Sequence, residues 1–182
     1  VCIIGNGLVS LALANVLIQK DIFVDILVTK KNNQYDKSRT LGLSKSNIDY
    51  FNTKIINIKK ILWEVKKIKI FTEKDKKKEI IKFENRDKQI FSIIQNYKLQ
   101  KILINKLKKS KFIKFKNISN LNNKKYKLVI NCDPKHQYTK KFFSNKIEKN
   151  YNSYAYTTTI IHKKIENNIA FQNFTDNGPI AF

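Results

Sequence analysis

Two glycines stand close together near the start of the chain, in the stretch VCIIGNGLVSLALAN that forms residues 1–15. The 182 residues include only four glycines, so Gly5 and Gly7 in one turn indicate a place where side chains are excluded. The turn joins an apolar, strand-like run to a helical one. A helix that begins there directs unpaired backbone N–H groups and partial positive charge at a neighbouring anion, and a diphosphate suits this arrangement. The residues expected to contact it are Gly5, Asn6, Gly7, Leu8, Val9 and Ser10.

The turn follows the spacing of the dinucleotide-binding fingerprint, with Ser10 at the third position, where a small residue lets helix and strand pack closely. An acidic residue about 20 residues further on would bind the ribose, but Val28 or Thr29 stands there. Thr29 can make one hydrogen bond, and Asp25 is expected to point elsewhere from within the second strand. The motif predicts a dinucleotide without choosing between NAD and FAD. A glycine turn without a ligand is the alternative.

The order of apolar and polar stretches predicts an α/β protein. Strand, turn, helix and strand occupy residues 1–29, a unit typical of a parallel sheet. An amphipathic helix is predicted over 98–110, because Leu99, Ile102, Leu103 and Leu107 share one face. The other predicted elements are a helix over 45–51 capped by Ser44, a hairpin formed by 63–71 and 79–84 around the charged 72–78, strands over 112–117 and 127–133, the second apolar enough for a central position, and strands over 154–162 and 168–174.

The chain carries 37 Lys and Arg against 14 Asp and Glu, a formal net charge of +23. Such a charge favours binding to nucleic acid or to an anionic membrane. Lys, Ile and Asn are abundant throughout while Arg is scarce, as a biased genome would produce, and phosphate-reading proteins prefer the planar fork of Arg. A basic nucleic-acid-binding protein is therefore an alternative, but no specific nucleic-acid partner is expected.

The cysteines and histidines predict neither a disulfide framework nor a metal site. Cys2 and Cys132 lie in apolar, strand-like runs, where buried free thiols of a reducing compartment are expected. His136 and His162 are far from each other and from any cysteine pair. No apolar stretch reaches the roughly 18 residues of a membrane span, and 8–18 lacks the basic lead-in of a signal peptide. These features predict a cytoplasmic protein.

Both ends of the sequence predict a fragment of a longer chain. Methionine is absent even at position 1, and the first residues already form a strand-like run. The last residues, NGPIAF, stop within an apolar stretch. We therefore expect truncation at both ends.

Three later stretches resemble flavin-dependent aromatic hydroxylases. DKSRTLGLSKSNIDYF at 36–51 is similar to a D-x-R-x-x-A-L-S pattern after the second strand of those enzymes, and IIQNYKLQKIL at 93–103 resembles their V-E-N-x-x-L-x-x-x-L helix entry. AYTTTIIHKKIENNIAFQNFTDNGPIAF at 155–182 resembles their A-x-x-T…A-F-E-R-F-T-x-x-G-P-L-A hairpin, the most specific match. Within this superfamily the chain is most similar to the ubiquinone-biosynthesis hydroxylases.

The resemblance implies that FAD is the dinucleotide. Gly5 and Gly7 would line its pyrophosphate, Arg39 would reach it from the loop after the second strand, and Gln100 would contact it from the helix. Asp133 ends an apolar strand as in the second flavin signature of the family, D-G-x-x-S-x-x-R.

The rest of that second signature is altered. Pro134, Gln137 and Lys140 replace its glycine, serine and arginine. Because the signature helps to hold both FAD and the entering nicotinamide, the changes argue against efficient reduction by NAD(P)H. A third motif of the family, G-D-A, is absent from the sequence, which agrees with truncation.

The resemblance implies a Rossmann-like FAD-binding domain over 1–62 and 86–150, with a parallel central sheet, and part of a mixed-sheet substrate domain over 63–85 and 151–182. The implied activity is hydroxylation of the aromatic ring of a ubiquinone precursor with NAD(P)H and oxygen. The cofactor carries this chemistry, so no catalytic side-chain pair is expected. The residues expected to line the substrate side of the flavin are Thr157, Phe171, Phe174 and Pro179.

The implied substrate is a polyprenylated phenol or quinol. Because such molecules reside in membranes, the expected partners include the inner face of a bacterial membrane, bound peripherally with the help of positive charge. A multi-enzyme or homo-oligomeric assembly is a further expectation. A degenerate flavoprotein that binds FAD without turnover is the alternative function.

Overall fold

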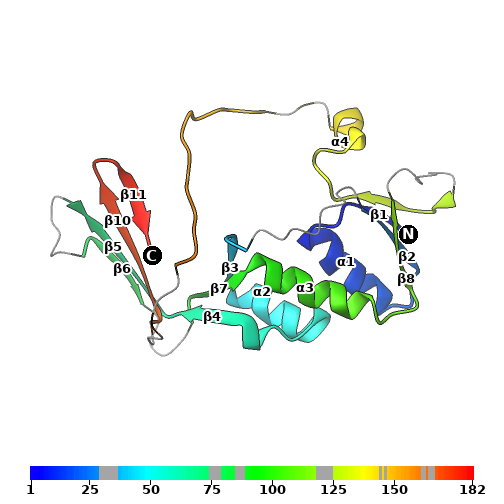
Figure 1. The fold of residues 1–182 in the computed structure, drawn as a ribbon, viewed down its shortest axis with the longest axis horizontal. Helices are drawn as coiled ribbons and strands as arrows, with labels where there is room; N and C mark the ends of the chain where they lie inside the picture. Colours follow the sequence, from blue (N-terminus) through cyan, green and yellow to red (C-terminus); the bar gives the residue numbers. More distant parts are fainter. Residues whose placement is uncertain are drawn as a thin grey trace.

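The computed structural model describes residues 1–28, 37–73, 79–84, 89–117, 125–143, 145, 147–160, 163 and 167–182. In this part of the chain we find a four-stranded parallel sheet with helices beside it, a small antiparallel sheet and a mixed sheet (Figure 1). The α/β fold class predicted from the sequence, with its parallel sheet and additional mixed sheet, is confirmed.

Strand β1 (Cys2–Ile4) lies inside the parallel sheet, whose strand order is β8-β2-β1-β9. Its neighbours are β2 (Val24–Val28) and β9 (Val129–Asn131), and β8 (Ile113–Asn117) pairs with the far side of β2. All three residues of β1 are completely buried, which explains the unbroken apolar run at the start of the sequence. The apolar stretch 127–133 forms β9 at the edge of the described sheet and not at its centre, because β1 takes the central place.

Helices α1 (Leu8–Ile18) and α3 (Asn96–Leu107) pack against each other and form the core with the parallel sheet. Asn15 of α1 is buried, and its Nδ2 donates to Leu11 O at 2.8 Å and to Leu103 O at 3.3 Å. This side chain therefore links the two helices. The buried residues of α3 are Leu99, Leu103 and Leu107, with Ile102 partly buried, as their spacing predicted.

A three-stranded antiparallel sheet stands between the two larger sheets (Figure 1). In it β3 (Thr40–Ser44) and β4 (Leu62–Val65) flank β7 (Phe91–Gln95). The helix after β3 begins as predicted, because the Ser44 hydroxyl accepts a hydrogen bond from Asn47 N at 3.3 Å. The short helices in this region are α2 (Lys45–Tyr50), the π-helix η1 (Phe51–Ile55) and the 3₁₀ helix η2 (Lys59–Ile61).

The mixed sheet has the strand order β11-β10-β5-β6. Its strands are β5 (Lys67–Thr72), β6 (Ile81–Glu84), β10 (Ile169–Thr175) and β11 (Gly178–Ala181). β5 and β10 are parallel, and the two outer pairs are antiparallel. The predicted hairpin is present as β5 and β6, but 63–71 is not one strand. The chain changes sheet at Lys66, so that β4 pairs with β7 while β5 pairs with β10.

Helix α4 (Gln137–Phe142) leads into a long connection to β10 (Figure 1). The prediction of a strand over 154–162 is wrong for its described residues, 154–160, which form neither strand nor helix. Tyrosines, threonines and isoleucine give this stretch a high strand propensity, but a strand also needs a neighbour for its backbone hydrogen bonds. The strand predicted over 168–174 is confirmed as β10.

The second face of the parallel sheet carries Cys2, Ile4 and Leu27, against which Tyr126 and Tyr138 pack. Both cysteines of the chain are free, as expected. Burial raises the pKa of the Cys2 thiol, so the group stays neutral and acts as a small apolar side chain.

Asp25 faces the same side and is held by two donors. Its Oδ2 lies 2.5 Å from Lys116 Nζ and accepts a hydrogen bond from the Tyr126 hydroxyl at 2.8 Å. Burial acts to raise the pKa of Asp25, but the hydrogen bonds from Lys116 and Tyr126 outweigh it, and the pKa is lowered. These contacts occupy the carboxylate, as its position within the strand predicted.

Asp25 makes the stability of the chain depend on pH in the acid range. Its folded pKa lies below its unfolded one, so the stabilisation is complete above an aspartate's ordinary pKa of about 4 and is lost as the pH falls through the lowered value. We expect Asp25→Asn to lower the free energy of unfolding at neutral pH and to flatten its decline in acid, measured by urea titrations at several pH values. Asp49→Asn, at an exposed residue of α2, is the control. Identical pH profiles for Asp25→Asn and the unaltered chain would contradict the assignment.

Candidate functional site

The carboxyl ends of β1 and β9 form the base of the candidate site. β2 and β8 lie on one side of β1 and β9 lies on the other, so the strand order reverses beside β1. Open α/β sheets bind ligands in the crevice at such a switch point. Gly5 directly follows β1, and Asp133 follows β9 by two residues. Cys132 N donates to Ile4 O at 3.0 Å, which keeps the two strand ends side by side.

At position 5, both the backbone conformation and the neighbouring atoms require a glycine. Its φ of +102° is in the region that side chains rarely adopt. A Cβ there would stand 3.4 Å from both Asp133 Cβ and Ser10 Oγ. Ser10 is completely buried, so the third position of the motif packs helix α1 against the turn as predicted. This glycine brings the helix onto the sheet.

At position 7, neither the backbone conformation nor the neighbouring atoms require a glycine. Its φ of −74° and ψ of 177° suit any residue, and a Cβ built on it would meet nothing within 4 Å. Glycine nevertheless stands at the N-cap of α1, where Ser or Asp would supply a capping oxygen and no side chain caps the helix. The absence of a Cβ at this position therefore leaves space next to the backbone that the described part of the protein does not fill.

The backbone N–H groups of residues 6–10 belong to this turn and to the first turn of α1. No described residue accepts a hydrogen bond from any of them, whereas Gly5 N donates to Leu27 O at 2.9 Å. Ser10 Oγ is also buried without a hydrogen-bond partner among the described residues. Val9 is 70% exposed, so this end of α1 is open to solvent. The predicted turn residues thus present a set of unpaired donors at a helix N-terminus, which suits an anion.

Gln100 and Arg39 approach the turn from the side of α3. Gln100 Nε2 donates to Asn6 O at 3.3 Å and so contacts the glycine turn directly. Arg39 O accepts a hydrogen bond from Asn96 N at 3.0 Å. Arg39, which is exposed, therefore lies beside the start of α3, and Gln100 follows one turn later in that helix. Gln100 therefore touches the glycine turn, and the backbone of Arg39 lies at the start of α3. Thr29 lies outside the described residues.

Asp133 occupies a turn between β9 and α4. Its Oδ1 accepts a hydrogen bond from Lys135 N at 2.9 Å, and its carbonyl accepts one from the Thr139 hydroxyl at 3.1 Å. Thr139 also accepts from Asn131 Nδ2 at 2.8 Å. The comparison with the family signature pointed to Gln137 for the serine position, but the hydroxyl that holds this turn is two residues later. Only the fold of the turn reveals it.

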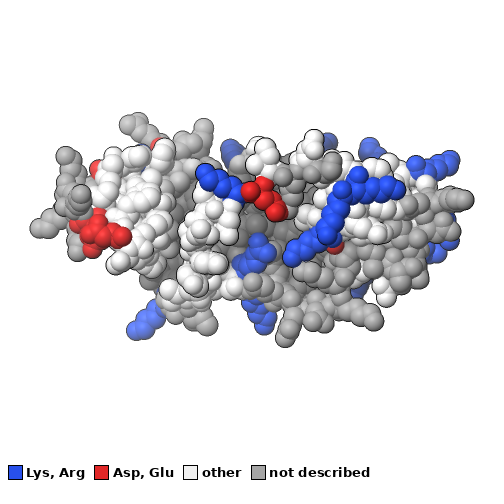
Figure 2. Space-filling view, turned by 90° about the horizontal axis from the view of Figure 1, so that it is seen from above, with Lys and Arg blue, Asp and Glu red and all other residues white. Residues whose placement is uncertain are grey.

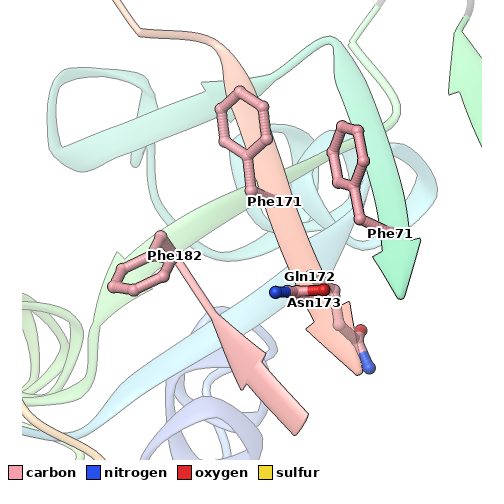
Figure 3. A pocket seen from close by; sticks show the side chains of 5 residues that line it. All are labelled: Phe71, Phe171, Gln172, Asn173 and Phe182. Atoms are coloured by element: carbon pink, nitrogen blue, oxygen red, sulfur yellow. The ribbon is translucent and has the colours of Figure 1, made fainter. Parts of the chain in front are cut away.

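A hollow of about 380 Å³ lies on the mixed sheet (Figure 3). Its lining residues are Phe71, Phe171, Gln172, Asn173 and Phe182. The rings of Phe71 and Phe171 are stacked with centroids 6.3 Å apart, and Asn173 Oδ1 is buried without a partner among the described residues. The hollow can therefore hold an apolar or aromatic group.

Of the predicted substrate-side residues, Phe171 lines this hollow. Phe174 and Pro179 lie opposite each other in β10 and β11. Thr157 was expected in a strand of the same sheet, but it lies in the connection after α4. Sequence reasoning missed Phe71 and Phe182, because their contribution depends on the pairing of β5 and β11 with β10. Among the described residues no three His, Cys, Asp or Glu side chains group as a metal site.

No family model and no curated protein matches the chain. Several solved structures match the fold of the chain. The p-nitrophenol 4-monooxygenase PnpA from Pseudomonas putida DLL-E4 matches with a TM-score of 0.53 and 11% identity, over 63% of this chain and 30% of that one. PqsL of P. aeruginosa in complex with 2-aminobenzoylacetate matches with a TM-score of 0.54 and 12% identity, over 63% of this chain and 32% of that one. A further PqsL structure, with a TM-score of 0.51, is described as a probable FAD-dependent monooxygenase.

The chain thus spans about a third of the length of the solved structures that it matches. At these identities the similarity establishes the fold. It is a fold found in monooxygenases, and the predicted Rossmann-like parallel sheet with an additional mixed sheet agrees with it.

The two glycines of the turn should respond differently to a methyl group. We expect Gly5→Ala to destabilise the chain by about 1–3 kcal/mol, because of its positive φ and its contact with Asp133. Gly7→Ala should change stability by less than about 1 kcal/mol, since a lost cap preference is offset by a less flexible unfolded chain. Denaturant titration of both variants measures the difference. A loss for Gly7→Ala as large as for Gly5→Ala would show that Gly7 serves the fold.

Proposed function

We propose that this chain binds FAD in the crevice between β1 and β9 and is part of a flavin-dependent monooxygenase. The observation that carries the proposal is Gly7, whose missing side chain does not serve the conformation of the chain and leaves room next to a turn with five N–H groups that no described residue accepts. The switch point of the parallel sheet and the similarity to monooxygenase structures support it.

The residues of the turn fit a diphosphate. Backbone N–H groups of Asn6, Gly7 and Leu8 would donate to it, and the N-terminal dipole of α1 would stabilise its charge. Ser10 Oγ adds a buried hydroxyl that has no partner in the described part of the chain. Bound FAD would supply oxygen transfer to an electron-rich ring, and the chain's own contribution would be to bind, to orient and to exclude water.

Arg39 and Gln100 would hold the cofactor from the side of α3. Gln100 already contacts the carbonyl of Asn6, so its amide can orient the turn as well as a ligand. Arg39, which directly precedes β3, is the cation that would reach the cofactor. Val28 ends β2 without a carboxylate, so the ribose would be held by weaker contacts than in most dinucleotide sites.

For the substrate we propose an aromatic ring, and more narrowly a phenol or quinol precursor of ubiquinone with a polyprenyl chain. The sequence resemblance at 155–182 suggests this narrower class. The aromatic hollow on the mixed sheet, with Phe71 and Phe171, supplies a surface of suitable chemistry. NAD(P)H is proposed as the electron donor.

A second candidate is a flavoprotein that binds FAD without turnover. The Asp133 turn favours it, because the carboxylate is engaged by Lys135 N and the following residue is Pro134 instead of glycine. Lys140 stands where the family has arginine and cannot form a bidentate fork. Both candidates require the same cofactor site, so they differ only in reduction and oxygen use.

Flavin titration tests the shared part of the proposal. We expect the chain to bind FAD, and Gly7→Val to weaken binding by at least about tenfold, or 1.4 kcal/mol, because its side chain would enter the ligand space. Gly42→Ala is the matched control, since that glycine lies in β3 and its new methyl would make ordinary contact with Phe91 at 3.6 Å. Flavin fluorescence and circular dichroism measure binding and folding. The proposal fails if FAD does not bind, or if Gly7→Val binds it as tightly as the unaltered chain does.

Turnover separates the two candidates. NADPH or NADH oxidation with oxygen uptake by the FAD-loaded chain supports the monooxygenase. Bound FAD that neither nucleotide reduces supports the flavoprotein without turnover.

A further inference from the structure

The connection from α4 to β10 exposes the largest concentration of hydrophobic side chains in the described chain. We name residues 143–160, apart from 144 and 146, the strap. Six described large hydrophobic residues are at least 72% exposed, and five of them lie in the strap. They are Phe143, Ile147, Tyr151, Tyr154 and Tyr156. Single exposed apolar residues are common, but several of them along one segment indicate an interaction surface.

Lysines accompany these side chains. Lys140 and Lys141 lie in the last turn of α4, and Lys149 lies within the strap. Lys149 Nζ stands 5.3 Å from the ring centroid of Tyr151. Glu148 is the one acidic residue in the sequence of 143–160. Figure 2, which looks down on this side of the molecule, shows lysine and arginine side chains over the region of α4. The strap and its flank therefore combine apolar rings with positive charge.

This combination suits the interface of a lipid bilayer. Tyrosine and phenylalanine rings are stable at the level of the headgroups, and lysines are attracted to the negative surface of anionic lipids. The strap forms no helix or strand in its described residues, so its backbone still needs water and cannot enter the hydrocarbon. None of the described helices has the length and apolarity to cross a membrane. Binding would thus be confined to the surface.

Nucleic acid fits these residues less well. Ile147 is 99% exposed and Ile160 is 65% exposed. Their aliphatic side chains can insert between lipid headgroups but offer no ring to stack on a base. Arginine, the preferred phosphate-reading residue, is absent from 140–163.

We propose that the strap, together with the lysines at the end of α4, binds the surface of an anionic lipid bilayer. The rings and isoleucines lie among the headgroups, and the lysines contact lipid phosphates. This interaction does not depend on FAD or on catalysis. It would hold the chain peripherally at a membrane.

Vesicle sedimentation tests the proposal with the 182-residue chain itself. We expect binding to vesicles of phosphatidylcholine with phosphatidylglycerol, little binding to phosphatidylcholine alone, and a decline with added salt. Tyr154→Ser with Tyr156→Ser should weaken binding by about tenfold, because two rings no longer insert. Tyr50→Ser with Phe83→Ser is the matched control, since it removes two half-exposed rings outside the strap without changing charge.

A tryptophan placed by Tyr156→Trp reports insertion directly. Its emission, added to that of Trp63, should be quenched by brominated lipid tails in anionic vesicles. The proposal is overturned if the chain does not bind these vesicles, or if the strap variant and the control variant bind alike. It is also overturned if the strap variant loses only self-association or RNA binding while vesicle binding is unchanged, because the strap would then be a contact of another kind.

Discussion

The contact of Gly5 with Asp133 and Ser10 is the constraint on which the rest of the site depends. It joins the end of β1, the first turn of α1 and the end of β9, with a Cβ position only 3.4 Å from its neighbours. The helix can reach the sheet this closely only because a small residue stands at each meeting point. Its N-terminus then lies at the switch point of the sheet, where the N–H groups of residues 6–10 have no acceptor among the described residues. A Cβ at Gly7 would meet no described atom within 4 Å.

Several carboxylates of this strongly basic chain are engaged in structural contacts. Asp25 is held by Lys116 and Tyr126 on the second face of the parallel sheet. Hydrogen bonds from Lys67 and Lys82 lower the pKa of Glu84 to about 2 on the mixed sheet. The Glu84 pairs are partly exposed to solvent, so they add little to stability. Asp133 is the acidic residue that the described structure places next to Gly5, and its Oδ1 accepts a hydrogen bond from Lys135 N.

The exposed apolar side chains of the chain differ from those of its core in having no cover. Around Ile3, Leu11 and Leu103 every apolar side chain has a partner, and burial stabilises the fold. On the mixed sheet and the strap, large rings remain accessible. The mixed sheet has a stacked pair of rings, Phe71 and Phe171, in a hollow. The strap has separate rings beside lysines. The hollow suits a single aromatic molecule, whereas the strap suits a broad and charged surface.

Local patterns in the sequence were enough to predict the glycine turn, α1 and β2, the helix with Leu99, Leu103 and Leu107, and the hairpin of β5 and β6. Each depends on residues close in sequence, through periodicity, capping or a tight turn. Partners distant in sequence were decided only by the tertiary structure. It placed β9 at the edge, divided 63–71 between two sheets, left 154–160 without a strand partner, and brought Phe182 to Phe71. Strand propensity carries no information about which strand becomes a neighbour, because pairing depends on the packing of the whole sheet.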